Sequence, residues 1–355
     1  MHPDRQGSRR SWTSGLCAIA LTLGISAPVS AADLTISNWD GYMAKDIAEQ
    51  FKAATGLTVD IVNHATNEEI MGKLMASQGA GYDVVFVSSP FAEILNNQGM
   101  LEPLDHKAVP NLANLYPEAA NLAYDPGNVF SVPYTWGTTG LCYRTDLVKT
   151  PVDSWMNLLK PDDSLKGKIT MLATDRWLMA AGLLAKGYSV NETDTAKIDE
   201  AKALLIEAKQ SLLAYDDTTF YSKLVSGEAS LVQAWDGWCN YGITDNKNIT
   251  FTVPKEGSDL WVDTIVVLKN SEHKADAMKF LNFILDPKNH AWAAQNILYK
   301  VPNKPAMESL DPALIKQYPT MGTTPAELTK YELLRDLGAS IKDYSRAVSE
   351  IKAAN

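Results

Sequence analysis

Three strand–helix units follow one another between residues 34 and 99, and this alternation constrains the fold more than any other feature of the chain. The strand patterns are "LTISNW", "LTVDIVNHA" and "YDVVFVSS", and a helical pattern follows each of them. The third run is apolar at nearly every position, which is typical of a central parallel strand covered on both faces. Successive units of this kind predict a doubly wound parallel sheet, in which ligands bind beyond the carboxyl ends of the strands.

Local signals support the three helices. Ile47 and Phe51 fall on one face of the first helix, and Gly56 is placed to end it. We expect Asn67 to cap the second helix, and Pro90 stands in the favoured first turn of the third. The sequence therefore predicts regular α/β structure from residue 34 onward.

A second α/β set begins near residue 167. "GKITML" is predicted as a strand and "WLMAAGLLAKG" as an apolar helix, followed by an amphipathic helix around Ile198 and Leu205. "EASLVQAWDGW" reads as a strand that runs into a turn, and "LWVDTIVVLKN" as the next strand. We therefore expect two α/β lobes joined by more than one strand crossing.

The first residues have the pattern of a secretory signal peptide. Three arginines (Arg5, Arg9 and Arg10) precede an apolar run over residues 15–25, and small residues occupy positions 29–31. The apolar run is too short to span a bilayer as a helix of the mature protein. We predict that residues 1–31 are removed after export through the general secretory route, which places the protein in the periplasm.

The charge of the remaining chain narrows the choice of partners. Without residues 1–31 there are 29 Lys and Arg against 41 Asp and Glu, a net charge of about −12. Nucleic acids and anionic lipids need basic patches, so neither is an expected partner, whereas a cationic ligand suits this balance.

Cys142 and Cys239 remain after processing, and the oxidising compartment allows a disulfide between them. Two buried free thiols are equally compatible with the sequence.

The chain carries no familiar catalytic motif. It has no GxSxG elbow, no phosphate-binding P-loop and no HExxH pair. Four histidines lie beyond residue 31, and none is spaced with cysteines or acids as a zinc site requires. We therefore predict that the protein is not an enzyme and uses neither a metal nor a cofactor.

One local theme recurs instead, an aromatic residue beside an acid at the end of a predicted strand. It occurs in "NWDGY" with Trp39, Asp40 and Tyr42, in "AWDGW" with Trp235 and Asp236, and in "LWVDT" with Trp261 and Asp263. The spacing of two in the last motif puts both side chains on the same face of a strand. Aromatic faces attract an ammonium group, and carboxylates accept its charged hydrogen bonds. The recurrence predicts a site for a cationic amine.

Simpler explanations compete with this one at each motif. A single Trp at a strand end usually packs in a core, and Asp40 and Asp236 each precede a glycine, as turn residues do. The energies still favour a binding site. A desolvated cation–π contact contributes about 2 kcal/mol, and a hydrogen bond to a charged group about 1.5–3 kcal/mol. Two or three of each suffice for micromolar affinity, which requires about 8 kcal/mol.

Seven motifs of the mature chain occur in the same order as in a known protein family. They are "SNWDGY", "GYDVVFVSS", "SVPYTWGTTG", "LVQAWDG", "KEGSDLWVDTIVV", "ADAMKFLNFILDP" and "YKVPN". With them the chain resembles the periplasmic spermidine/putrescine-binding proteins, which are receptors of ABC importers. The resemblance implies the α/β fold of type II periplasmic binding proteins, two doubly wound lobes joined by a hinge of crossing strands. Lobe 1 would comprise residues 32–137 and 262–307, and lobe 2 residues 138–261 and 308–355. It also implies a monomer whose closed form meets a membrane permease.

The resemblance also implies which residues line the cleft between the lobes. The matching positions are Trp39, Tyr42, Ser88, Trp235, Trp261, Asp263 and Tyr299. Among them, Asp263 would receive an amine, and Trp39 and Trp261 would flank the methylene chain. Asp40, Asp236 and Trp177 complete the predicted ligand-binding set.

Several positions depart from the family pattern. The acid of the first motif stands one place early at Asp40, and Thr174 and Trp177 occupy places where the family tends to carry acids. With fewer carboxylates for a second ammonium, a monocationic or zwitterionic nitrogen compound is the alternative ligand: a quaternary amine, a γ-amino acid or an opine. Arg176 would then clamp a ligand carboxylate.

A secreted enzyme with an aromatic subsite is the rival from another class, but such enzymes need a positioned carboxylate pair.

Overall fold

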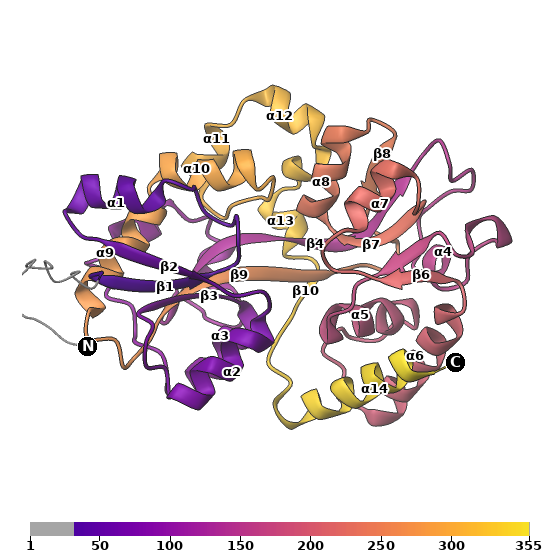
Figure 1. Ribbon diagram of the computed structural model, residues 1–355, viewed down its shortest axis with the longest axis horizontal. Helices are drawn as coiled ribbons and strands as arrows, with labels where there is room; N and C mark the ends of the chain where they lie inside the picture. Colours follow the sequence, from indigo (N-terminus) through magenta and orange to yellow (C-terminus); the bar gives the residue numbers. More distant parts are fainter. Residues whose placement is uncertain (1–31, 355) are drawn as a thin grey trace, which may run out of the picture. The chain divides into compact units, whose positions relative to one another are not determined.

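Residues 32–354 are described by a computed structural model of the chain. Their strands are β1 (Leu34–Asn38), β2 (Val59–Asn63), β3 (Val84–Ser88), β4 (Ser131–Arg144), β5 (Ile169–Met171), β6 (Leu212–Tyr215), β7 (Leu231–Trp235), β8 (Ile249–Thr252), β9 (Asp259–Val267) and β10 (Glu332–Leu333). These ten strands of the described residues form one hydrogen-bonded network in the order β2-β1-β3-β9-β4-β7-β5-β6 (Figure 1). Strand β10 pairs with β9, and β8 pairs with β4.

The first three strands form the parallel sheet that the sequence predicts. Strand β1 pairs in parallel with both β2 and β3. Every residue of β3 is buried, and its side chains alternate between two apolar clusters. Val84 and Phe86 belong to one cluster, and Val85 and Val87 belong to the other. The prediction of a central strand covered on both faces is therefore confirmed.

Helices cover both faces of the sheet in each half of the described chain (Figure 1). In the half that contains β1, helix α1 lies on one face, and α2 and α3 lie on the other. In the half that contains β7, helices α7 and α8 lie on one face, and α5, α6 and α14 on the other. The helices are α1 (Ile47–Thr55), α2 (Asn67–Ser77), α3 (Ser89–Asn97), α4 (Met156–Leu159), α5 (Asp175–Ala185), α6 (Thr195–Lys209), α7 (Phe220–Ser226), α8 (Asp236–Asp245), α9 (Lys274–Ile284), α10 (Pro287–Asn296), α11 (Lys304–Glu308), α12 (Pro312–Gln317), α13 (Pro325–Leu328) and α14 (Ile341–Ala353).

Two long strands connect the halves. The first part of β4, from Ser131 to Thr138, pairs with β9, and from Thr139 onward β4 pairs with β7. Strand β9 runs antiparallel to both β3 and β4. The α/β fold class is confirmed, and β4 exchanges partners between Thr138 and Thr139. The predicted lobe boundaries at 137/138, 261/262 and 307/308 stay predictions.

Two local predictions are wrong. Thr66, rather than Asn67, caps helix α2, because the Thr66 side chain accepts a hydrogen bond of 3.1 Å from the backbone N–H of Glu69. Asn67 instead turns toward β3. The strand β7 is followed by a helix and not by a turn, since α8 begins at Asp236. Its first-turn carboxylate accepts the N–H of Gly237 at 2.8 Å and suits the positive end of the helix.

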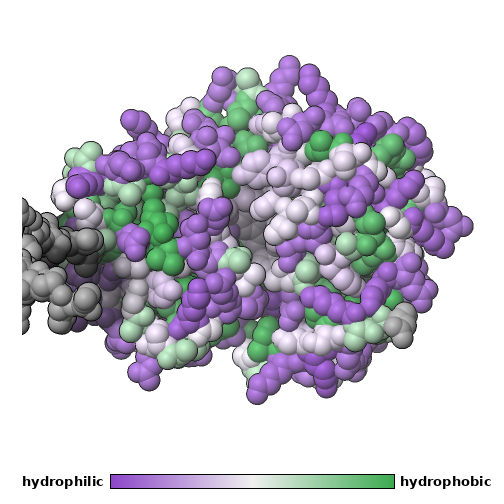
Figure 2. Space-filling model, in the orientation of Figure 1, coloured by the Kyte–Doolittle hydropathy of each residue, from purple (hydrophilic) through white to green (hydrophobic). Residues whose placement is uncertain are grey.

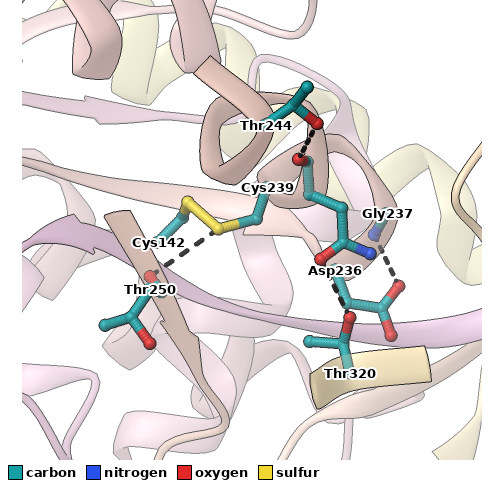
Figure 3. Close-up of a disulfide and its surroundings, with 8 residues drawn as sticks. Cys142, Asp236, Gly237, Cys239, Thr244, Thr250 and Thr320 are labelled. Carbon is teal, nitrogen blue, oxygen red and sulfur yellow. Dashed lines mark hydrogen bonds between the residues drawn. A yellow bond between two sulfur atoms is a disulfide. The ribbon is translucent and has the colours of Figure 1, made fainter. Parts of the chain in front are cut away.

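The two cysteines form a disulfide that ties β4 to α8 (Figure 3). Their Cα atoms lie 5.9 Å apart, a separation that suits such a bond. Both residues are buried. The bond settles the choice between a disulfide and two free thiols, which the sequence left open.

The predicted signal peptide, residues 1–31, lies outside the described residues. Within residues 32–354, no helix combines the length and the apolar character needed to cross a membrane.

Candidate functional site

Asp263 of β9 lies at the centre of the predicted residues. Its two carboxylate oxygens accept hydrogen bonds of 2.7 Å, one from the Tyr42 hydroxyl and one from the Ser88 hydroxyl. Ser88 ends β3 and pairs directly with Asp263 across the sheet, which is why the two side chains meet. The Tyr42 hydroxyl also lies 2.8 Å from the Thr135 hydroxyl on β4. Three residues that the sequence selected, Tyr42, Ser88 and Asp263, therefore form one hydrogen-bonded group.

The environment of Asp263 leaves its carboxylate able to accept further hydrogen bonds. Burial raises the pKa of Asp263, and hydrogen bonds from Ser88, Tyr42 and Thr135 act in the opposite direction. None of the ion pairs formed within residues 32–354 includes this carboxylate. An ionised carboxyl group can accept about four hydrogen bonds, so the group retains acceptor capacity for a cation.

Aromatic rings surround this group in a connected series. The Trp39 ring lies 5.3 Å from that of Tyr42, the Tyr42 ring 6.1 Å from that of Tyr299, and the Tyr299 ring 5.0 Å from that of Trp261, all edge to face. His64 also packs on Trp39, with ring centres 5.0 Å apart. Burial and the charges of Asp236 and Asp263 hold the pKa of Tyr299 well above its ordinary value.

Two side chains that support the group were not predicted. The side-chain amide of Asn67 accepts the backbone N–H of Ser88 at 2.9 Å and donates to the Ser88 hydroxyl at 3.1 Å. Thr135 approaches Tyr42 from β4 as described above. Thr135 lies within the motif "SVPYTWGTTG", and Asn67 was expected only to cap a helix. The pattern of an aromatic residue beside an acid gave no signal for either of them.

Asp236 is engaged by the protein itself. This buried carboxylate forms an ion pair with the buried ammonium group of Lys300 and accepts the backbone N–H of Thr138 at 3.2 Å. Lys300 was not predicted, although it directly follows Tyr299 in the sequence. The charge of Asp236 is thus neutralised by an internal amine.

Asp40 and Trp39 lie at different depths. Asp40 is exposed and accepts a hydrogen bond of 3.1 Å from the Asn63 amide at the end of β2. Trp39 is half-buried through its contacts with Tyr42 and His64. Asp40 therefore belongs to the surface beside the first two strands, rather than to the hydrogen-bonded group around Asp263.

The remaining predicted residues form a second aromatic pair. The rings of Trp177 on α5 and Trp235 at the end of β7 lie 5.5 Å apart, edge to face. Neighbouring Arg176 is buried and donates to the carbonyls of Arg335 and Val190 and to the side chain of Asn191. Its guanidinium group therefore fastens other segments of the chain, and none of these contacts involves the residues around Asp263.

Two glycines allow the close packing at the centre of the site. A Cβ atom at Gly137 on β4 would lie 2.3 Å from the Trp261 ring and 2.5 Å from a carboxylate oxygen of Asp236. A Cβ atom at Gly237 would lie 2.0 Å from the Tyr299 ring. Only glycine fits at either position.

Other features of the described residues lie away from this group. A surface hollow of about 420 Å³ is lined by residues that include Thr150, Lys160 and Lys255, and by none of the predicted ones. No cluster of three or more His, Cys, Asp or Glu side chains within residues 32–354 is arranged to hold a metal ion.

The two α/β halves share β4 and β9, and aromatic rings and the half-buried carboxylate of Asp263 lie beside these shared strands. This arrangement defines a bilobal solute-binding protein. Figure 2 shows the visible face hollowed between the two halves. Residues 46–323 match the family of bacterial extracellular solute-binding proteins, and the chain belongs to this family.

Named relatives cover nearly the whole chain. The chain is 30% identical over 351 residues to the spermidine/putrescine-binding periplasmic protein of Escherichia coli strain K12, covering 97% of this chain and 99% of the relative. It is 32% identical over 321 residues to the putrescine-binding periplasmic protein PotF of the same organism, covering 84% and 85%. Among solved structures, a putative spermidine/putrescine ABC transporter from Listeria monocytogenes superimposes with a TM-score of 0.83 at 29% identity, covering 91% of this chain and 99% of that one.

Proposed function

We propose that this chain is the periplasmic receptor of an ABC importer for polyamines, namely putrescine, spermidine or a related cationic amine. The observation that carries the proposal is the half-buried carboxylate of Asp263. Tyr42 and Ser88 hold it in place, and no cationic side chain within residues 32–354 neutralises it. The names of the two Escherichia coli relatives support the same class of ligand.

In this proposal, Asp263 receives an ammonium group of the ligand. The rings of Trp39, Tyr42, Trp261 and Tyr299 flank the ammonium and the methylene chain. Each desolvated cation–π contact contributes about 2 kcal/mol, and a hydrogen bond to a charged group about 1.5–3 kcal/mol. Trp177 and Trp235 form the far aromatic wall, Asp236 acts through its pair with Lys300, and Asp40 meets the ligand from the surface.

The proposal extends to the working cycle. The receptor would be exported with cleavage of residues 1–31 and would act as a monomer without catalysis, metal or cofactor. Its lobes, residues 32–137 with 262–307 and residues 138–261 with 308–355, would close on the ligand and present it to the membrane permease. The negative charge of the mature chain supports a cationic ligand and disfavours nucleic acid.

The zwitterionic alternative lacks support from the contacts of Arg176. A clamp for a ligand carboxylate needs an open guanidinium fork. Both terminal NH2 groups of Arg176 instead bind the protein, at the backbone of Arg335 and Val190 and the side chain of Asn191. Among the described residues only its buried Nε–H has no partner. We therefore favour a ligand whose ends are cationic.

A thermal-shift screen tests the proposal. A ligand that binds only the folded state raises the unfolding midpoint, with about 4 kcal/mol of stabilisation at 1,000 times its Kd. We expect putrescine or spermidine to raise the midpoint, and γ-aminobutyrate and glycine betaine to leave it unchanged. A shift with only the latter two would establish the alternative ligand class. Recovery of chemically altered amine after incubation would contradict the binding function and indicate an enzyme.

A further inference from the structure

A second carboxylate lies on the same face of β9 as Asp263. Asp259 begins this strand, and the alternation of side chains places Asp259, Trp261 and Asp263 on one face. Asp259 is completely buried, yet neither of its carboxylate oxygens has a hydrogen-bond partner within residues 32–354. It also belongs to none of the ion pairs of this part of the chain. A buried acid without partners is costly and needs an explanation.

Its surroundings are polar and equally unsatisfied. The indole N–H groups of Trp177 and Trp261 and the Thr139 hydroxyl are all buried without a hydrogen-bond partner. Burial raises the pKa of Asp259 to about 6, while the nearby Thr139, the charge of Arg176 and Trp177 act in the opposite direction. Arg176 is thus close enough to influence this pKa. Its terminal NH2 groups bind the segments around residues 190 and 335, while its buried Nε–H has no hydrogen-bond partner among the described residues.

We propose that Asp259 is the second cation-binding carboxylate of the site, and that it receives the far ammonium group of a linear diamine whose near ammonium binds Asp263. The methylene chain lies across Trp261, which stands between the two acids on the strand. This inference rests on the proposed function and adds to it a selection by ligand length.

The spacing on the strand fixes that length. Four residues of β-strand separate the Cα atoms of Asp259 and Asp263 by about 13 Å. A charged hydrogen bond of about 2.8 Å at each end leaves roughly 7–8 Å between the two nitrogen atoms of the ligand. An extended chain of four or five methylenes spans about 6–8 Å between its nitrogens. The site therefore selects diamines of the length of putrescine and cadaverine over shorter and longer ones.

The simpler explanation is that Asp259 only balances the buried charge of Arg176. The two explanations differ in what Asp259 does for ligands with one or two cationic ends. A balancing charge affects every ligand through the fold, whereas a binding carboxylate affects only a ligand whose second ammonium reaches it.

Calorimetric titrations with n-butylamine and a series of diamines from three to eight methylenes distinguish them. For the unaltered protein we expect affinity to peak at four or five methylenes, with putrescine at least tenfold tighter than n-butylamine. In Asp259→Asn we expect at least a tenfold loss for putrescine and less than a twofold change for n-butylamine. Asp245→Asn, an equal charge change at an exposed acid outside the predicted site, should leave both affinities within twofold.

Equal losses for both amines in Asp259→Asn, or equal affinities for both in the unaltered protein, would overturn this inference and leave the proposed function intact. Failure of every amine to bind would overturn both.

A second measurement needs no variant. At pH 5.5 a fraction of Asp259 is protonated. The neighbouring Arg176 also interacts with the titratable groups of Tyr344, Asp336 and Glu332. Titration in buffers of different ionisation enthalpy should show more proton release with putrescine than with n-butylamine, because only the diamine requires ionised Asp259. Both ligands contact Asp263, so its titration cancels from the difference. Equal proton release by the two ligands would contradict the inference, even if Asp259→Asn failed to fold.

Discussion

The hydroxyl of Tyr42 donates a hydrogen bond of 2.7 Å to Asp263, although 221 residues separate the two in the sequence. The bond joins the segment after β1 to the long strand β9. Since Ser88 of β3 donates to the other oxygen of the same carboxylate, the orientation of the carboxylate is fixed both from β3 and from the segment after β1. A carboxylate held in this way loses little further freedom when a ligand arrives.

Asp263→Asn should weaken amine binding at least tenfold, because the amide keeps the shape of the side chain but removes its negative charge. Isothermal titration with putrescine measures the change. Asp245→Asn provides the matched control, since it removes one negative charge from an exposed residue outside the predicted site. An unchanged affinity in Asp263→Asn would reject Asp263 as the ammonium ligand.

Lys300→Met should lower the free energy of unfolding by about 3–5 kcal/mol, because it leaves the buried carboxylate of Asp236 without its partner. The double variant Asp236→Asn/Lys300→Met should lose less than the sum of the two single variants, since neither buried charge remains. Urea unfolding at pH 7 supplies the three free energies. Strict additivity would show that the two side chains do not interact.

The disulfide between Cys142 and Cys239 should contribute about 4–5 kcal/mol to stability, because it closes a loop of 97 residues in the unfolded chain. Cys142→Ala/Cys239→Ala, or reduction of the unaltered protein, should lower the unfolding midpoint accordingly. Reducing agent should have no effect on the double variant. A midpoint that reductant leaves unchanged in the unaltered protein would contradict this contribution.

His290 should make the protein less stable in acid. Its Nε2–H donates to the Tyr134 carbonyl at 2.7 Å, and burial lowers the pKa of His290 from 6.5 to about 4. As the pH falls from 6.5 to 4, the unfolded chain binds a proton that the folded protein excludes. The free energy of unfolding therefore falls by roughly 3 kcal/mol over this range.

His290→Gln keeps a hydrogen-bond donor but removes the titration. Unfolding midpoints measured from pH 7 to pH 4.5 should fall less steeply in this variant than in the unaltered protein. The raised pKa of Asp259 has the opposite effect, favouring the folded state toward acid between about pH 4 and 6. Because Asp259 is present in both proteins, its contribution does not affect the comparison. Parallel curves would contradict a neutral, buried His290.

The strands and helices could be read from the sequence because their signals are local. The continuous apolar run around Val84 and Phe86 predicted a buried strand. Ser88, which the family resemblance selected, ends that strand, as expected for a ligand site beyond the carboxyl ends of parallel strands. Spacing by two also predicted the shared face of Trp261 and Asp263. The same rule extends to Asp259, which stands two residues before Trp261 as Asp263 stands two residues after it, but which the predicted motif "LWVDT" did not include.

Other parts of the site depend on contacts that no local pattern records. The pairing of Asp236 with Lys300 joins residues 64 apart, and a lysine beside a tyrosine carries no signal of burial. Asp40 shows the converse case. Its motif resembles the other two, but the chain after β1 leaves the carboxylate at the surface beside Asn63.

The absence of side chains at Gly137 and Gly237 limits how this receptor can be re-engineered as a sensor for other compounds. A single methyl group at either position would collide with Trp261 or Tyr299, so libraries that vary these positions would consist mostly of damaged proteins. Diversity is better placed at the exposed Asp40, where a new side chain has room. New specificities would therefore come from substitutions at the exposed edge of the site, while Gly137 and Gly237 remain unchanged.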